Sequence, residues 1–101
     1  MRVQIEKEHN KIIVSPQGYI DEETAVHFRR LLDDAIKAYP DAIILDFADV
    51  DFMDSTGIGT LLSRYKVMRN NDITLSIRNV NLQVDKLFRL TGIYSILNLE
   101  R

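Results

Sequence analysis

A nearly continuous apolar run, Ala-Ile-Ile-Leu-Asp-Phe at residues 42–47, stands near the middle of the chain. An apolar run that does not alternate with polar residues predicts a buried parallel strand covered by helices. The sequence Asp-Phe-Met-Asp-Ser-Thr-Gly-Ile-Gly-Thr follows at residues 51–60. Apolar residues then recur every three or four positions, as on one face of a helix: Ile58, Leu61, Leu62, Tyr65 and Met68. The centre of the chain therefore predicts a strand, a short turn and an amphipathic helix, as in α/β domains.

Two hydroxyl residues, Ser55 and Thr56, stand at the predicted strand-to-helix turn. The first amides of a helix lack partners within it, so we expect these hydroxyl oxygens to accept hydrogen bonds from them. Gly57 and Gly59 follow, although a glycine in a helix costs roughly 1 kcal/mol relative to alanine. Such a cost indicates a place where a Cβ atom would block a close approach. The approaching group is either a neighbouring strand or a partner that reaches for the hydroxyl, and the residues alone leave both open.

The residues before this centre predict a hairpin and a helix. Residues 3–8 alternate between apolar and polar, and residues 12–14 form a second strand that pairs back through a turn. A first helix is expected to begin at Asp21, as its N-cap, and to stop at Pro40. Its apolar stripe consists of Ala25, Phe28, Leu31, Leu32, Ala35 and Ile36.

The residues after the centre predict another strand, a third helix and a final strand. Residues 73–77 alternate cleanly, and Asn81 and Gly92 are expected to cap the two ends of the third helix. The last apolar segment, residues 93–99, is interpreted as a short edge strand. This order predicts an α/β layer fold with right-handed crossovers, built as one domain of residues 1–101.

Composition excludes several functions. The formal net charge of −2 and the pI near 5.6 give no basic surface, so we expect no direct contact with nucleic acid. The absence of cysteine excludes disulfides and thiolate chemistry. The first residues lack the apolar core of a signal peptide, and no apolar run approaches the ~20 residues that cross a membrane. We therefore expect a soluble, cytoplasmic protein without membrane contact.

Ser55 beside Asp54 could suggest a catalytic serine, but the surrounding pattern argues against one. The nucleophile elbow of esterases needs Gly-x-Ser-x-Gly, and its first position here is Met53. A serine nucleophile also needs a base, and the two imidazoles belong to His9, in a predicted turn, and His27, on the polar side of the first helix. We therefore predict that the protein is not an enzyme.

Patterns for phosphate or metal binding are also incomplete. The glycines at residues 57 and 59 are followed neither by a third glycine nor by Lys-Ser or Lys-Thr, so the dinucleotide fingerprint and the P-loop both fail. Four aspartates could suggest a metal site, but their spacing does not match a calcium loop: Asp46, Asp49, Asp51 and Asp54. The sequence predicts no cofactor and no metal.

Ser55 is better interpreted as a substrate of phosphorylation. A phosphate would add about −1.5 to −2 charges at the turn, and the unpaired amides of the helix can accept it at modest cost. An interface that buried the turn would have to desolvate that phosphate, which is expensive. We therefore expect a modification here to switch binding more than folding.

The residues around the turn resemble a known family. The run Asp-Ser-Thr-Gly-Ile-Gly at residues 54–59, with Phe-Met before it and Leu-Leu-Ser-Arg-Tyr-Lys at residues 61–66, is similar to the phosphorylation loop and second helix of bacterial anti-sigma-factor antagonists. These are small single-domain members of the STAS family, and the match is closer to the sporulation group than to the general-stress group. Residues 18–25 resemble the start of the family's first helix, and residues 87–93 resemble its third helix and exit.

This resemblance implies an anti-anti-sigma factor. In the family, the unphosphorylated antagonist binds an anti-sigma factor that is also a serine kinase, and thereby frees the sigma factor. The kinase phosphorylates the serine after the loop aspartate, which is Ser55 here; the complex then separates, and a phosphatase restores the active form. The resemblance also implies partner contacts at Asp21, Glu22, Asp54, Thr56, Gly57, Ile58 and Gly59.

The family fold carries the same order of elements plus a further C-terminal helix. Because this sequence ends at Arg101, the resemblance predicts a STAS-like domain with a mixed, mainly parallel sheet, packed helices and a C-terminal helix that is short or absent.

Three other functions are considered beside the switch. One is a STAS scaffold or sensor within a larger signalling complex, with the loop hydroxyls as slower regulatory sites. Another is an enzyme or nucleotide-binding domain that uses the glycine-rich turn. The third is a phospho-aspartate receiver with Asp46 or Asp49 as acceptor, which would also need an acidic pair after the first strand and a lysine late in the sheet. The sequence favours the switch over all three.

Overall fold

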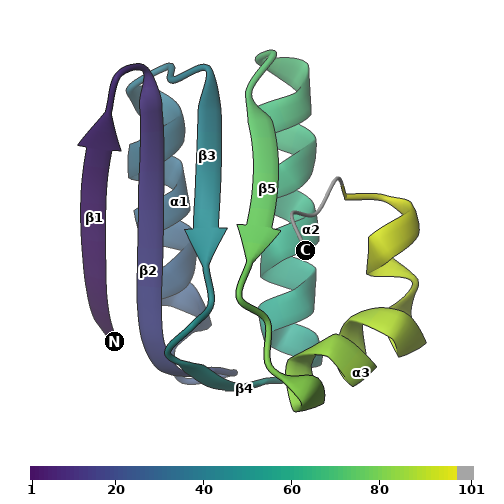
Figure 1. The fold of residues 1–101 in the computed structure, drawn as a ribbon. Coiled ribbons are helices and arrows are strands. Elements are labelled where there is room, and N and C mark those ends of the chain that lie inside the picture. Colours follow the sequence, from purple (N-terminus) through teal and green to yellow (C-terminus); the bar gives the residue numbers. More distant parts are fainter. Residues whose placement is uncertain (98–101) are drawn as a thin grey trace.

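The computed structural model describes residues 1–97 and contains the hairpin that the N-terminal alternation predicts. β1 (Arg2–Glu8) pairs antiparallel with β2 (Lys11–Ile20), from Arg2 opposite Gln17 to Glu8 opposite Lys11. The tight turn between them is made by residues 9 and 10. This hairpin supplies one edge of the sheet, with β1 outermost (Figure 1).

Beyond the hairpin, helices and strands alternate. The elements are α1 (Ala25–Lys37), β3 (Ala42–Asp46), β4 (Val50–Met53), α2 (Ser55–Asn70), β5 (Thr74–Arg78), α3 (Leu82–Thr91) and the short 3-10 helix η1 (Ile93–Ser95). β3 pairs parallel with β2 on one side and with β5 on the other, so the strands stand in the order β1-β2-β3-β5 (Figure 1). The predicted mixed, mainly parallel sheet is confirmed.

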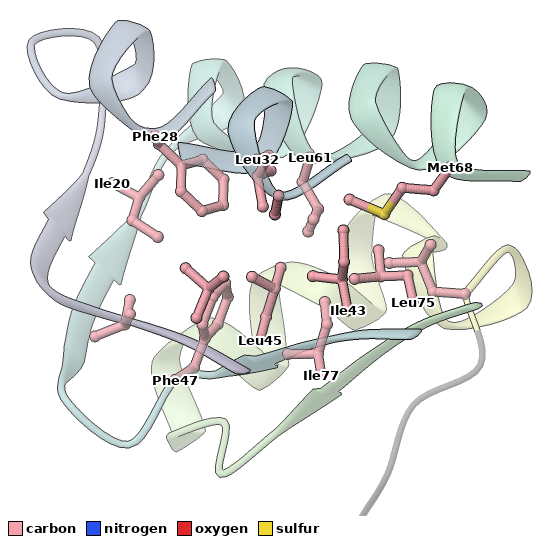
Figure 2. Close-up of a cluster of buried hydrophobic side chains, with 14 of the residues drawn as sticks. Ile20, Phe28, Leu32, Ile43, Leu45, Phe47, Leu61, Met68, Leu75 and Ile77 are labelled. Atoms are coloured by element: carbon pink, nitrogen blue, oxygen red, sulfur yellow. The ribbon is translucent and has the colours of Figure 1, made fainter. Parts of the chain in front are cut away.

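The core lies between this sheet and two helices, α1 and α2, which cover the same face of it (Figure 1). Figure 2 shows side chains of both helices against side chains of two strands, β3 and β5: Phe28, Leu32, Leu61 and Met68 face Ile43, Leu45, Leu75 and Ile77. Each of these eight side chains is at most 2% exposed. Burial of one such side chain contributes about 1.5–3 kcal/mol, so this layer holds both helices firmly against the sheet.

A short strand that the sequence analysis did not predict, β4, lies at one end of the sheet (Figure 1). It pairs parallel with the last residues of β2, from Gly18 opposite Val50 to Ile20 opposite Met53. Its two buried end residues enclose two exposed ones, a pattern without the alternation that predicts a strand. Because α2 begins two residues after β4 ends, this pairing places the start of α2 beside the end of β2.

β2 is also longer than predicted. It continues through Pro16 and Gly18, two residues that usually weaken a strand, because β1 pairs with its first part and β4 with its last three residues. Gly18 adopts φ 89°, and the register with β4 shifts at this point. A glycine permits this backbone conformation, which other residues rarely adopt.

The start of α1 differs from the prediction. Asp21 does not cap the helix, because its Oδ1 atom instead accepts hydrogen bonds from the amides of Glu23 and Thr24, at 3.0 and 3.2 Å. These bonds form a turn at residues 21–24, here called the Asp21 turn, and the helix begins only at Ala25. The apolar stripe of α1 is confirmed, with one member, Leu31, only half-buried.

Both predicted caps of α3 are confirmed. The Asn81 side chain accepts a hydrogen bond from the Val84 amide at 2.9 Å, and Gly92 ends the helix in the left-handed region at φ 72°. The predicted last strand is wrong at residues 93–95, which form η1. Residues 98 and 99 of that prediction lie outside the described residues.

Candidate functional site

The start of α2 is capped by Asp54, one residue before the two hydroxyls. The backbone of Asp54 is extended, and its Oδ1 atom accepts a hydrogen bond from the Gly57 amide at 2.9 Å. Ser55 and Thr56 are the first two residues of the helix. The expectation that their oxygens cap the helix is therefore wrong, because the side chain that reaches back to the first amides belongs to the preceding residue.

The two hydroxyls point away from the core. Both Ser55 and Thr56 are exposed, and within residues 1–97 neither side-chain oxygen forms a hydrogen bond to another group. A cap by Asp54 leaves these oxygens available to an approaching molecule. The sequence prediction required an accessible Ser55 hydroxyl, and the structure provides one.

The two glycines of the loop have different surroundings. A Cβ atom on Gly57 would lie 2.6 Å from the carbonyl oxygen of Ile20, so the helix can approach β2 this closely only with glycine at this position. A Cβ atom on Gly59 would meet no atom within 4 Å, and this residue is exposed. The neighbouring strand therefore explains Gly57 and leaves Gly59 without an explanation inside the described part of the chain.

The Asp21 turn lies against the start of α2. The Glu22 amide donates a hydrogen bond to the Oδ2 atom of Asp54 at 3.2 Å, and the Asp54 amide donates to the carbonyl oxygen of Ile20 at 3.2 Å. The Thr24 hydroxyl closes the turn by donating to the carbonyl oxygen of Tyr19 at 2.8 Å. The structure thus brings the Asp21 turn together with Asp54 and Ser55, as the family resemblance implies.

The predicted contact residues divide by exposure. Gly57 and Ile58 are buried, and Ile58 is only 5% exposed, so these two pack the start of the helix against the core. The other positions are exposed or partly exposed and can meet another molecule: Asp21, Glu22, Asp54, Ser55, Thr56 and Gly59.

An apolar groove that the sequence analysis missed runs beside this site. It has a volume of about 410 Å³ and lies between β4 and α3, lined by Phe52, Met53, Asp54, Gln83, Lys86, Leu87 and Leu90. Leu90 is 85% exposed. The signal in the sequence is that Leu90 falls off the buried face of α3, which Val84 and Phe88 define.

A second apolar feature borders the same site. Phe52 of β4 packs on Tyr19 of β2 with ring centroids 5.8 Å apart, although both rings remain substantially exposed. These rings belong to the paired strand ends that lead into the Asp21 turn and into α2. The acidic loop residues are therefore flanked by apolar surface.

Asp46, one of the four aspartates near residue 50, is held by local hydrogen bonds. Asp46 accepts from the Ala48 amide, the Asn79 side chain and Arg78, at 3.0, 3.1 and 3.2 Å. Burial alone would raise the pKa of Asp46, but these three hydrogen bonds outweigh it and hold the pKa below its ordinary value. Within residues 1–97, no three His, Cys, Asp or Glu side chains gather in a way that could hold a metal ion.

Comparison with known families agrees with this geometry. The STAS domain matches residues 2–101. This chain belongs to the STAS family. A relative from Paenibacillus polymyxa, named anti-sigma F factor antagonist, is 33% identical over 100 residues, which cover 96% of this chain and 86% of the relative.

Two solved structures show the same fold as this STAS domain. The anti-sigma factor antagonist SpoIIAA in its unphosphorylated form aligns with a TM-score of 0.74 at 21% identity, over 99% of this chain and 88% of that one. The Bacillus cell fate determinant SpoIIAA in its phosphorylated form aligns with a TM-score of 0.69 at 21% identity, over 99% of this chain and 92% of that one. The predicted STAS fold is confirmed.

Within residues 1–97 of this STAS domain, none of the helices combines the length and the apolar character that crossing a bilayer requires.

Proposed function

We propose that this STAS domain is an anti-sigma factor antagonist and that phosphorylation of Ser55 switches its binding off. The unphosphorylated form binds an anti-sigma factor that is also a serine kinase, which releases the sigma factor. The kinase then phosphorylates Ser55 and the complex separates, and a phosphatase restores the binding form. The observation that carries the proposal is the exposed Ser55 hydroxyl at the start of α2, next to a capped and packed helix end.

The surroundings of Ser55 make a phosphate effective as a switch. Asp54 already uses the Gly57 amide, so a phosphate on the neighbouring residue would add about −1.5 to −2 charges beside a carboxylate that occupies part of the helix terminus. In water this repulsion is screened. In an interface that covers Ser55 it is not, and the phosphate would also lose its hydration.

The site supports the role of substrate and not that of catalyst. His9 and His27 are both exposed, and within residues 1–97 neither forms a hydrogen bond to the Ser55 hydroxyl. A serine without a base beside it remains a poor nucleophile. We therefore propose a regulatory protein in which the chemistry at Ser55 is supplied by the kinase and the phosphatase.

The first test of the proposal is to identify the proteins that bind to this STAS domain. Unphosphorylated protein is used to capture binding proteins from an extract of the source organism, and mass spectrometry identifies them. We expect an anti-sigma factor with a serine kinase domain among them. If the captured proteins include no anti-sigma factor, the proposed function is wrong.

The captured anti-sigma factor is then purified and tested with two variants and a matched control. Ser55→Ala should bind and resist phosphorylation by ATP, whereas Ser55→Asp should bind at least ~10-fold more weakly, since its charge would be buried unpaired. Thr56→Ala removes the neighbouring exposed hydroxyl and should still be phosphorylated. Phosphorylation of Ser55→Ala to the same stoichiometry as the unchanged protein would show that the site lies elsewhere.

A further inference from the structure

The Asp54 carboxylate forms two hydrogen bonds with separate parts of the chain. Its Oδ1 atom accepts from the Gly57 amide at 2.9 Å, within the first turn of α2. Its Oδ2 atom accepts from the Glu22 amide at 3.2 Å, across 32 residues of sequence. Capping a helix requires only one of these oxygens, so the second bond has a separate consequence.

The Asp21 turn is ordered by its own hydrogen bonds, and within residues 1–97 the bond from the Glu22 amide to Asp54 is the hydrogen bond that joins it to the start of α2. Asp21 Oδ1 binds the amides of Glu23 and Thr24, and the Thr24 hydroxyl binds the carbonyl oxygen of Tyr19. These bonds give the turn its shape and do not set its position relative to Ser55. The residue before the turn is held by the bond from the Asp54 amide to the Ile20 carbonyl oxygen. The bond from the Glu22 amide to Asp54 adds a tie within the turn itself, because Asp54 caps α2 and adjoins Ser55.

We propose that Asp54 is a positioning residue that joins the Asp21 turn to the start of α2, so that the two segments meet the partner as one preorganised surface. This inference rests on the proposed function, since it concerns the surface that the anti-sigma factor covers. The exposed Glu22 amide contributes little to stability through this bond, because water can replace Asp54 as its acceptor. Its value lies in binding, where a surface that is already ordered has less conformational freedom to lose.

Two substitutions separate capping from positioning. Asp54→Ser keeps a good N-cap oxygen for the Gly57 amide. The serine side chain is shorter and has only one oxygen, so none remains for the Glu22 amide. Asp54→Asn keeps the shape and one acceptor, and it turns an NH₂ group toward the Glu22 amide, which is itself a donor. The matched control is Asn81→Ser, which shortens an N-cap on α3, outside the proposed partner surface.

The first measurement uses the isolated protein and needs no partner. Amide hydrogen exchange followed by NMR should become several-fold faster at Glu22 in both Asp54 variants, while exchange at Gly57 changes by less than about twofold and Asn81→Ser leaves Glu22 unchanged. A merely structural cap would not produce this separation. Unchanged exchange at Glu22 in both variants would overturn the proposal.

The second measurement is calorimetric binding to the purified anti-sigma factor. We expect both Asp54 variants to bind ~10-fold more weakly or worse at an unchanged melting temperature, and Asn81→Ser to bind as the unchanged protein does. If Glu22 is released and affinity is unchanged, positioning by Asp54 is wrong while the Ser55 switch stands. If the unchanged protein binds no anti-sigma factor, the proposed function fails and takes the positioning role with it.

Discussion

The starts of α2 and α3 are capped in the same way and attached to the rest of the protein in different ways. Asp54 and Asn81 each accept a hydrogen bond from the amide three residues ahead, in both cases at 2.9 Å. The second polar atom of each side chain then reaches another segment. Asp54 holds the Glu22 amide, whereas the Asn81 side-chain NH₂ donates to the carbonyl oxygen of Val50 at 2.9 Å.

This difference shows why one cap is a carboxylate and the other a carboxamide. A carboxylate offers two acceptors, which suits a helix amide plus a second N–H group. A carboxamide offers one acceptor and two donors, which suits a helix amide plus a carbonyl group. The two residues rank almost equally as caps, so the identity of the second partner is what distinguishes them.

The largest effect on the start of α2 is expected from Gly57→Ala. The new Cβ atom would lie 2.6 Å from the Ile20 carbonyl oxygen, so α2 or β2 must shift and weaken the packing between them. Overpacking of this kind costs about 1–3 kcal/mol and occasionally more. Urea unfolding followed by circular dichroism should show a loss of this size, and a change below about 0.5 kcal/mol would mean that the contact between helix and strand is not tight.

A smaller loss is expected at the start of α3 from Asn81→Asp. Aspartate caps as well as asparagine, but it cannot donate to Val50 and places a carboxylate oxygen against that carbonyl group. We expect a loss of about 1–2 kcal/mol in the free energy of unfolding. The control is Asn81→Ser, which removes the donor without adding charge and should cost less. Equal losses in the two variants would show that charge is irrelevant here.

At Gly59 the expected change has the opposite sign. A Cβ atom there meets nothing within 4 Å, so Gly59→Ala should raise the free energy of unfolding by about 0.5–1 kcal/mol through helix propensity and the entropy of the unfolded chain. Measuring Gly59→Ala and Gly57→Ala in the same urea experiment compares the free energy of unfolding for a substitution on the open side and one on the packed side of the same helix turn. Weaker binding of the stabilised variant to the anti-sigma factor would identify Gly59 as a place of close approach by the partner.

Much of the fold follows from patterns that the sequence carries locally. The buried strand β3, the apolar stripe of α1 and the caps Asn81 and Gly92 were predicted correctly, because each depends on periodicity or on one residue type at a helix end. β4 was missed, because its four residues form a strand only by pairing with the end of β2. The extension of β2 through Pro16 was missed for the same reason.

The candidate site was predictable in its residues and not in its connections. Ser55 and Asp54 were identified from the loop motif, and the structure confirms that Ser55 is exposed. The capping role was predicted for the hydroxyls of Ser55 and Thr56 and belongs to Asp54, since Asp, Ser and Thr all favour the N-cap position. The hydrogen bond between Asp54 and the Glu22 amide joins residues 32 positions apart, and no local sequence pattern predicts it.

The smallest effect on stability is expected at Ser55 itself. Its side chain is exposed and, within residues 1–97, bonds to no other group, so Ser55→Ala should change the free energy of unfolding by no more than about 0.5 kcal/mol. Phosphoserine at the same position gains from the helix dipole and loses through repulsion by Asp54, two contributions of similar size and opposite sign. Urea unfolding of protein made with phosphoserine at residue 55 should therefore stay within about 1 kcal/mol of the unmodified form. A loss well beyond this value, large enough to unfold a substantial fraction of the protein, would make the modification a folding switch and remove the reason for placing its effect in an interface.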